Sequence, residues 1–416
     1  MRGSLDPELN EPLDAALSDP SGRLEASRRR RRAAAARRRW RRRWTIAVVA
    51  LLALLSPAFY SYTRWMLQPT SMSAGVRSVE WLRVQPGGSW LVDKVEHVYY
   101  SWRAPRKGGP QLTRLPSVGV GTSHAATGER HAKQKRWPPN IEPVFAHPLR
   151  GEGVWKPSGP AIDGKPPVLV TSFRSERDYP RVVAYVAWFD HTRTAVAFYP
   201  GRYEPPSAAV RGPMMVPYGQ RWRLLATFNS GFTYAYGSNG STDNGRVNEP
   251  LTDGNATLVG YRNGRVAIVK WHGGPNAGKN VAWSRQSLPP IVWNGKVNPN
   301  LDLSLKWGET LGNAVRVWRT GVGIDRRGNL IFVAADAQTV ISLARILQHV
   351  GAVRAMQFDI NPYWHTLITY THHHGLAARM VEPQPNHSAS RYLVPDDRDF
   401  FAVYRRLPGP ITVPFR

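Results

Sequence analysis

The chain has 416 residues, contains no cysteine and carries a formal net charge of +27. The lack of cysteine excludes disulfides and thiol chemistry, and the length allows one large domain with extensions. The excess of positive charge favours an anionic partner, such as a lipid surface, nucleic acid or a phosphate-bearing polymer.

The first 62 residues are read as a tail followed by a membrane anchor. Residues 1–43 are polar and basic, and we predict a disordered basic tail there. The apolar segment at 44–62, with aromatic residues at both ends, approaches the length of about 20 residues that a bilayer crossing needs. It is predicted to be a single-pass signal-anchor in the cell membrane. Three arginine runs precede it, at Arg28–Arg32, Arg37–Arg39 and Arg41–Arg43.

The arginine runs place the N-terminus in the cytoplasm and the C-terminal domain outside it. One alternative is a cleaved signal peptide that ends near Ser56-Pro57-Ala58. Another is a nucleic-acid-binding arm, but the runs directly adjoin an apolar segment, so no nucleic-acid partner is expected.

Residues 63–150 are predicted to be a juxtamembrane and linker region, and residues 151–407 the folded domain. Within the linker, Ser78–Leu82 and Asp93–Trp102 are compatible with strands or with a juxtamembrane helix. The folded domain is predicted to be α+β, a strand-rich mixed sheet with one main helix at about 338–350. The Asn263-Gly264 pair predicts a hairpin, and Asn294-Gly295 repeats that signal more weakly. Strands are predicted at Val168–Phe173, Val182–Asp190, Thr194–Tyr199, Leu224–Asn229, Ala256–Tyr261, Arg265–Trp271, Leu367–Tyr370 and Phe400–Tyr404.

The rest of the domain is organised around the stretch Arg319–Thr366. Two apolar runs, Gly321–Asp325 and Asn329–Ala334, predict a hairpin. The helix follows and ends before Gly351, which serves as its C-terminal cap. A third apolar run, Val353–Phe358, then places Asp359 at the carboxyl end of a buried strand.

Three motifs in this chain resemble those of the phosphodiester glycosidase family, over roughly 154–406. They are Asn229-Ser230-Gly231-Phe232, Arg319–Gly323 and Phe358–Pro362. The third motif keeps the aspartate of the family's Leu-Asp-Gly-Gly-Gly-Ser-type element but lacks its glycines. The resemblance implies a hydrolase that cleaves a sugar–phosphate diester.

Such cleavage needs a carboxylate near the sugar carbon and cations that hold the phosphate. The predicted catalytic residues are Asp359, Asp336 and Glu249. The alternative interpretations are a turn cap for Asp359, an ordinary surface charge for Arg319 and a helix N-cap region for Asp336. The aromatic rings of Trp307, Trp318 and Trp364 suit sugar binding. The predicted substrate-binding residues are Asn229, Arg319, Asn361, Arg391 and Trp364.

No metal site is predicted. Consecutive histidines in a strand point to alternate faces, so His372-His373-His374 favours an exposed loop over a metal site. Asp243 and Asp253 offer oxygen ligands, which leaves Ca²⁺ open as a cofactor.

The leading hypothesis is a membrane-anchored extracytoplasmic hydrolase that cleaves a sugar–phosphate diester in a cell-envelope glycopolymer or glycolipid. The alternative is a non-catalytic protein that binds an envelope polymer on the same fold. It is motivated by Ile360–Tyr363, which fill the space that three glycines would leave to a ligand.

Overall fold

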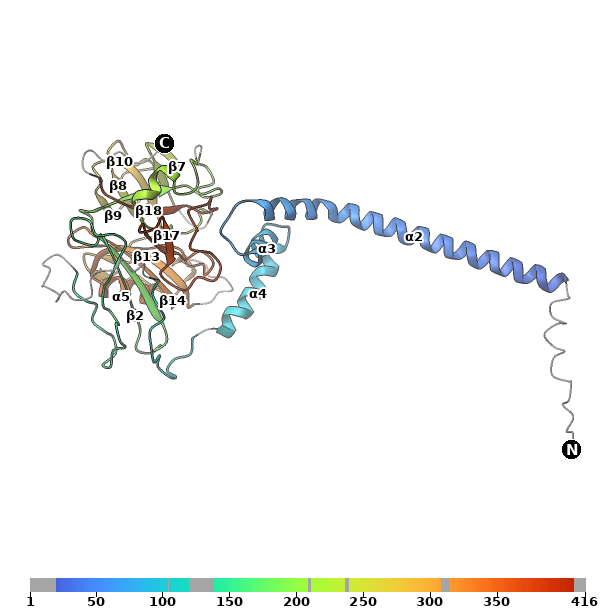
Figure 1. Cartoon of the computed structure of the whole chain (residues 1–416), viewed down its shortest axis with the longest axis horizontal. Coiled ribbons are helices and arrows are strands. Elements are labelled where there is room, and N and C mark those ends of the chain that lie inside the picture. The colour runs from blue at the N-terminus through green and yellow to red at the C-terminus, as the bar shows by residue number, and fades with distance from the viewer. Residues whose placement is uncertain are drawn as a thin grey trace, which may run out of the picture. The chain divides into compact units, whose positions relative to one another are not determined.

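The computed structural model describes residues 20–103, 105–119, 138–208, 211–235, 239–307 and 315–407. The chain divides into two compact units, Met1–Gln68 and Pro69–Arg416. In the first unit, helix α2 spans Pro20–Leu67 (Figure 1). Of the tail predicted to be disordered, residues 1–19 lie outside the described part, whereas Pro20–Arg43 is helical, as its alanine and arginine content favours.

The segment Ser27–Leu67 of α2 contains a stretch long and apolar enough to cross a membrane. This confirms the prediction of one helix that could span a bilayer. The property concerns length and composition alone, and a signal sequence near an N-terminus shares it. The signal-peptide alternative therefore stays open.

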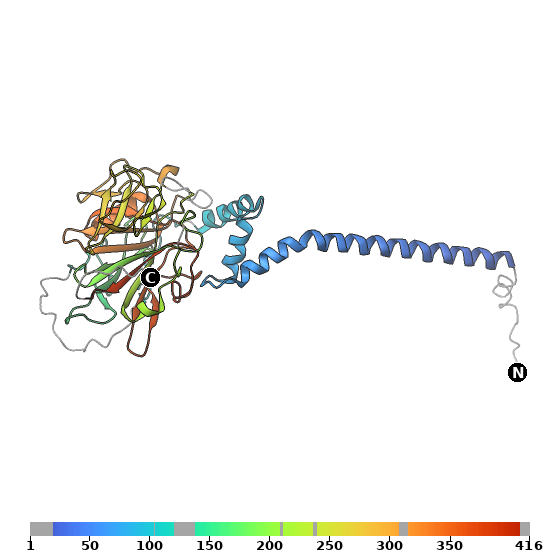
Figure 2. The same ribbon diagram turned by 90° about the horizontal axis from the view of Figure 1, so that it is seen from above.

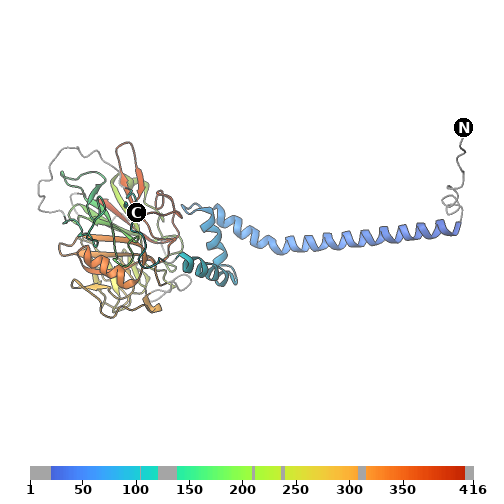
Figure 3. The same ribbon diagram turned by 90° about the horizontal axis from the view of Figure 1, so that it is seen from below.

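The second unit begins with two helices, α3 (Ala74–Arg83) and α4 (Gly88–Arg103). Both lie at one edge of the body in three views (Figures 1, 2 and 3). The Arg83 guanidinium joins them, because Nη2 donates to Glu96 Oε1 at 2.7 Å and Nη1 to Asp93 Oδ1 at 3.1 Å. The segment compatible with strands or helix is thus helical, and it shares a unit with the body.

The body contains three sheets whose named strands pair antiparallel rather than as a mixed sheet. The largest has the order β1 (Lys156–Ser158), β2 (Val168–Arg174), β3 (Val183–Phe189), β14 (Leu330–Gln338), β13 (Val317–Asp325), β15 (Ala352–Gln357), β11 (Val292–Trp293), β12 (Lys296–Val297). The second has the order β17 (Ala377–Met380), β16 (Leu367–Thr371), β5 (Leu224–Asn229), β18 (Phe400–Arg405), β4 (Thr194–Tyr199). The third has the order β7 (Arg246–Glu249), β6 (Ser241–Asp243), β10 (Val281–Gln286), β8 (Ala256–Tyr261), β9 (Val266–Lys270).

The eight-stranded sheet is buried on both faces. Along β14, Phe332 belongs to the core shared with the five-stranded sheets, and its neighbours Ile331 and Val333 belong to the core under α5. Side chains alternate between faces along a strand, so burial of both faces produces the continuous apolar run in the sequence. The α+β prediction is confirmed, including the main helix: α5 spans Val340–His349 and covers one face of this sheet (Figure 3).

The predicted hairpin of the central stretch is confirmed as β13 and β14. Its glycines have a packing role against α5 and β15. A Cβ on Gly323 would lie 2.5 Å from the Ala352 Cβ, and one on Gly321 would lie 2.9 Å from the Met356 carbonyl oxygen. A Cβ on Gly321 would also lie 3.0 Å from Leu347 Cδ1 of α5, so β15 and α5 pack closely on β13 because these two positions lack side chains. The hairpins about Asn263-Gly264 and Asn294-Gly295 also form, between β8 and β9 and between β11 and β12.

Candidate active site

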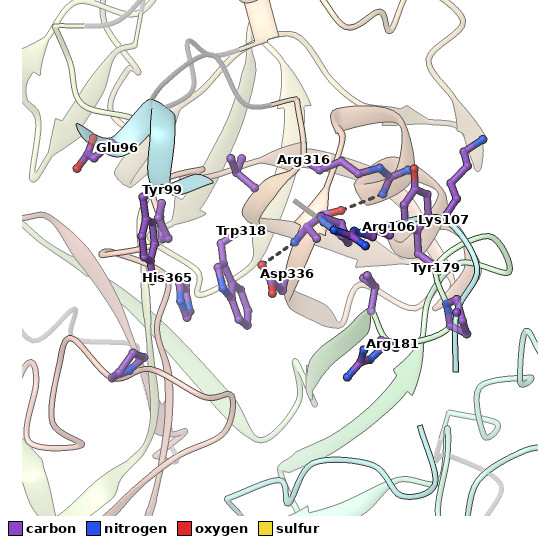
Figure 4. Close-up of a pocket in the computed structure, with 18 of the residues that line it drawn as sticks. Glu96, Tyr99, Arg106, Lys107, Tyr179, Arg181, Arg316, Trp318, Asp336 and His365 are labelled. Carbon is purple, nitrogen blue, oxygen red and sulfur yellow. Dashed lines mark hydrogen bonds between the residues drawn. The ribbon is translucent and has the colours of Figure 1, made fainter. Parts of the chain in front are cut away.

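A pocket of about 1190 Å³ opens where β13 and β14 meet α4. Its floor comes from the ends of these strands, and the segments 105–110, 179–182 and 362–365 form further walls. Figure 4 labels residues from the floor and from these walls. Parts of the chain that are distant in sequence thus meet at one site.

Among the described residues that line the pocket, Glu96 and Asp336 carry carboxylates. Glu96 is buried and paired with Arg83, so the exposed carboxylate comes from Asp336. It is exposed, although the residues on both sides of it in β14 are buried. The register of β13 and β14 shifts between Val317 and Arg319, opposite this point, and Ala337 adopts a φ of 53°. Such a conformation is uncommon for a residue with a Cβ, and strain of this kind concentrates at functional sites. The irregularity turns the Asp336 side chain out of the sheet and into the pocket.

Trp318 and His365 form a stacked pair beside Asp336. Their ring centroids are 3.8 Å apart with an interplanar angle of 7°. Tyr185 stacks near the indole as well, at 6.4 Å. In Figure 4 Trp318 lies between His365 and Asp336. The indole is therefore held in place by aromatic contacts.

His365 is only 2% exposed and has a carboxylate behind it. Its Nδ1 lies 3.6 Å from Glu382 Oε1, which also accepts a hydrogen bond from the Leu367 amide. The prediction missed His365, because a single histidine between Trp364 and Thr366 has no spacing signal. Trp318 had been noted for its aromatic ring.

Cationic side chains line the opposite wall of the pocket. Arg106 and Arg181 are exposed and form no ion pair within the part of the chain that the structure describes. Lys107 lies 3.6 Å from Asp178, and both side chains remain mostly exposed. Arg316 differs, because Glu176 holds it in a bidentate pair at 2.7 and 2.9 Å. The first three cations are therefore available to an anionic ligand.

Among the eight predicted site residues, all of which are described, Asp336 lines this pocket. Asp359 is buried, and the Arg398 Nη2 donates to its Oδ2 at 2.9 Å. Burial raises the pKa of Asp359, although Arg398 opposes that change. Its Oδ1 accepts from the Asn361 amide, and Asn361 Oδ1 accepts from the Tyr363 amide. These two bonds shape the turn that carries Tyr363 to the pocket, as the turn-cap interpretation of Asp359 requires.

Asn229 and Arg319 lie in the interior. Asn229 Nδ2 donates to Thr320 Oγ1 at 2.9 Å, and its Oδ1 accepts from the Thr366 amide, so it links β5 to β13 and to the segment just before β16. Arg319 donates to the Gln338 carbonyl at 2.8 Å and forms no ion pair among the described residues. Burial lowers the pKa of Arg319 to about 10.

The remaining predicted residues occupy other surroundings. Arg391 is buried and donates to Asp396 Oδ2 at 2.9 Å. Trp364 is buried in a cluster with Met72 and Val76 from the segment around α3. Glu249 lies at the end of β7, and its Oε1 accepts from the Ser207 amide at 3.3 Å.

The described residues include no group of three or more histidine, aspartate or glutamate side chains placed to hold a metal ion. His372 Nε2 instead lies 2.7 Å from the Leu224 carbonyl oxygen. Asp243 is buried on β6, whereas Asp253 is exposed. The structure thus adds no support to a Ca²⁺ site at that pair.

The three motifs in the sequence resemble those of the phosphodiester glycosidase family. Residues 223–359 match the family model of phosphodiester glycosidases, so the resemblance is confirmed over this stretch. No curated protein matches the chain.

Three solved structures are similar to the chain. The zebrafish N-acetylglucosamine-1-phosphodiester alpha-N-acetylglucosaminidase catalytic domain, auto-inhibited by its pro-peptide, is 15% identical with a TM-score of 0.39, over 60% of this chain and 87% of that chain. A hypothetical protein from Synechocystis is 13% identical with a TM-score of 0.34, over 60% and 64%. A protein from Burkholderia pseudomallei is 12% identical with a TM-score of 0.30, over 53% and 74%.

The family match covers the base of the pocket and leaves out several of its walls. It includes Trp318 and Asp336 and ends at Asp359. It excludes α4, the segment 105–110 and His365. The walls contributed by these parts are features of this chain that the family match does not describe.

Proposed function

We propose that this protein is a membrane-anchored extracytoplasmic hydrolase that cleaves a sugar–phosphate diester at the pocket around Asp336. One observation carries the proposal: a chain that matches phosphodiester glycosidases places a carboxylate, an aromatic stack and three cations around one pocket. Each of these groups has a role in the reaction. The carboxylate acts at the sugar carbon, the aromatic rings hold the sugar, and the cations hold the phosphate.

The chemistry follows from the leaving group. Cleavage breaks the bond between the anomeric carbon and the phosphate oxygen, and the electron pair stays on that oxygen. A phosphate monoester is stable as an anion, so it needs charge stabilisation more than protonation, and Arg106, Lys107 and Arg181 provide it. A water molecule bonds to the anomeric carbon, and its proton passes to the Asp336 carboxylate.

Other predicted residues support the site from the interior in this proposal. Asp359 and Asn361 hold the turn that carries Tyr363, and Asn229 fixes the strands below. His365 lies against Trp318 with Glu382 behind it, which holds the indole face toward the sugar. The anchor is α2, with the N-terminus in the cytoplasm.

The test is sugar release from a chromogenic sugar phosphodiester by the Pro69–Arg416 unit. Asp336→Asn is expected to lower kcat by at least about 100-fold, the usual range for a lost acid–base group. Asp163→Asn is the matched control, because Asp163 is an exposed carboxylate outside the pocket. Circular dichroism of each variant verifies folding. Equal turnover of the two variants would show that Asp336 has no chemical role.

The second candidate is a non-catalytic protein that binds an anionic envelope polymer. Pro362 and Tyr363 favour it, because they line the pocket and belong to Ile360–Tyr363, which fill the space that the family's three glycines would leave to a ligand. It predicts salt-sensitive binding of a sugar-phosphate polymer without product release, with or without Ca²⁺. Product release that Asp336→Asn abolishes would exclude it.

A further inference from the structure

Helix α4 carries an exposed apolar stripe. Leu91, Val95, Val98 and Trp102 follow the i, i+4, i+7, i+11 spacing of one helical face, and all four are exposed. Val98 is 69% exposed and Trp102 91% exposed. A contiguous exposed apolar surface of this kind on a folded unit is typical of a site that binds a protein or a membrane.

Another face of α4 packs against α3. Val92 and Glu96 are buried, and Glu96 accepts a hydrogen bond from Arg83 of α3 at 2.7 Å. The stripe therefore cannot turn inward without breaking this attachment. Its exposure is a property of the folded unit.

Composition and charge identify a lipid surface as the occupant. Trp90, Tyr99 and Trp102 are exposed aromatic residues of the type that settles at the boundary between headgroups and acyl chains. Exposed cations, Lys94 on α4 and Arg106 and Lys107 just beyond it, complement anionic headgroups. The membrane-spanning candidate ends at Leu67 and α4 begins at Gly88, so the chain keeps the helix within reach of a bilayer.

The stripe and the pocket share residues. Val95 and Tyr99 are exposed on α4 and also line the pocket, as do Arg106 and Lys107. In Figure 4 Tyr99 projects from α4 toward Trp318 and His365. Whatever covers the stripe therefore lies at the mouth of the pocket.

We infer that α4 lies on the surface of an anionic bilayer and opens the pocket toward it, so that the substrate is a lipid-linked sugar phosphodiester. The bilayer contact is independent of the proposed function, whereas the substrate class rests on it. The apolar part of such a substrate stays in the bilayer, and the sugar and phosphate reach Trp318 and the cations. A soluble envelope polymer has no apolar part that would contact the apolar residues at the mouth of the pocket.

The absence of native cysteine permits a direct test in the full chain. Val98→Cys and Trp102→Cys are spin-labelled singly, and the protein is placed in vesicles of phosphatidylcholine with one quarter phosphatidylglycerol. Electron paramagnetic resonance then measures label access to oxygen and to a water-soluble nickel complex. Both labels are expected to favour oxygen, whereas Arg326→Cys, an exposed turn position, is expected to favour nickel.

Two results of this experiment would overturn the lipid contact. Labels on α4 that resemble the Arg326 control would place the stripe in water. Dipolar broadening between labels, with or without lipid, would show that a second copy of the chain covers the stripe.

A kinetic measurement tests the substrate class. The double variant Val98→Gln/Trp102→Gln leaves the pocket lining intact, and it is expected to raise the KM for a lipid-linked sugar phosphodiester by roughly tenfold. Turnover of a water-soluble phosphodiester should not change. Trp222→Gln is the matched control, because Trp222 is exposed outside the pocket.

An equal effect of the double variant on both substrates would contradict the lipid-linked substrate. Buried labels without turnover of any phosphodiester would contradict the proposed function and leave the lipid contact supported.

Discussion

Asp243 illustrates how burial alone changes the behaviour of a single residue in this protein. It lies on β6 with only 8% exposure, and its Oδ1 has no hydrogen-bond partner among the described residues. Burial raises the pKa of Asp243 to about 6, while Arg246 opposes the change. The folded protein therefore holds this proton more tightly than the unfolded chain does.

The ionisation of this carboxyl group should make the stability of the protein depend on pH. Between about pH 4 and pH 6 the free energy of unfolding should fall as pH rises, because the folded state must ionise a buried acid. Asp243→Asn removes that effect, so at pH 7 it should stabilise the Pro69–Arg416 unit by about 2 to 3 kcal/mol. Urea unfolding at pH 4, 5, 6 and 7 measures it. A parallel pH dependence in the wild type and the variant would rule the explanation out.

At the scale of residues, the one predicted site residue that lines the pocket lies in none of the three family motifs. Asp336 was named from its place in the central stretch, and it lines the pocket. The direction of the Asp336 side chain, however, depends on a register shift and on the backbone conformation of Ala337, which sequence patterns do not reveal. His365 was not predicted, because its importance lies in its contact with Trp318 across the fold.

At the scale of elements, α5 shows how a short polar sequence sets a helix boundary. The Thr339 Oγ1 accepts from the Ser342 amide at 3.0 Å, and the Ser342 Oγ accepts from the Thr339 amide at 2.9 Å. This reciprocal capping satisfies two backbone donors that the first turn would leave free. The helix therefore begins at Val340, directly after β14.

Removing this cap should lower the stability of the protein. Thr339→Ala is expected to lower the free energy of unfolding by about 1 kcal/mol, since the Ser342 amide loses its acceptor. Thr339→Ser keeps the hydroxyl and serves as the matched control, with a smaller change. Urea unfolding of the Pro69–Arg416 unit measures both. Equal losses in the two variants would attribute the effect to the methyl group of threonine instead of the cap.

The elements were predicted well where periodicity reflects burial. The strands of the central stretch were predicted from apolar runs, and these runs exist because both faces of the large sheet are covered. The helices α3 and α4 were ambiguous, because β-branched and aromatic residues such as Val95, Val98 and Trp102 suit strands as well. In the structure both segments are helices. Arg83 of α3 donates to Glu96 of α4, and Val76 of α3 packs against Trp364, which is remote in sequence.

At the scale of the whole molecule, positive charge should govern binding of an anionic substrate. The net charge is +27, and three of the exposed cations that contribute to it line the pocket. In the proposed function these cations attract the phosphate, and salt screens exposed charges over about 10 Å at 0.1 M ionic strength. Substrate affinity should therefore depend on salt.

We predict that the KM for a sugar phosphodiester rises roughly five-fold between about 0.05 and 0.5 M salt, with kcat little changed. The triple variant Arg106→Gln/Lys107→Gln/Arg181→Gln should lose most of this dependence. The control Lys296→Gln/Arg326→Gln/Arg327→Gln removes the same charge at exposed positions outside the pocket. Steady-state kinetics measures all three proteins. Equal salt dependence in both variants would assign it to net charge rather than to the pocket.

The overall class was predictable, but the assembly of the site was not. Strand and helix content follows from local patterns, whereas the pocket joins α4 and the segment 105–110 to residues beyond position 316. No local pattern encodes which of these segments meet. The role of the region read as a linker therefore emerged only from the three-dimensional arrangement.

The strand order of the second sheet has a consequence for biosynthesis. Strand β18 (Phe400–Arg405) lies between β5 and β4, and β4 has no other partner in that sheet. A growing chain therefore presents the open edges of β4 and β5 until residue 405 has left the ribosome. Open strand edges pair readily with other chains, so this sheet depends on protection from aggregation throughout its synthesis. Completion of this sheet is thereby coupled to the synthesis of β18.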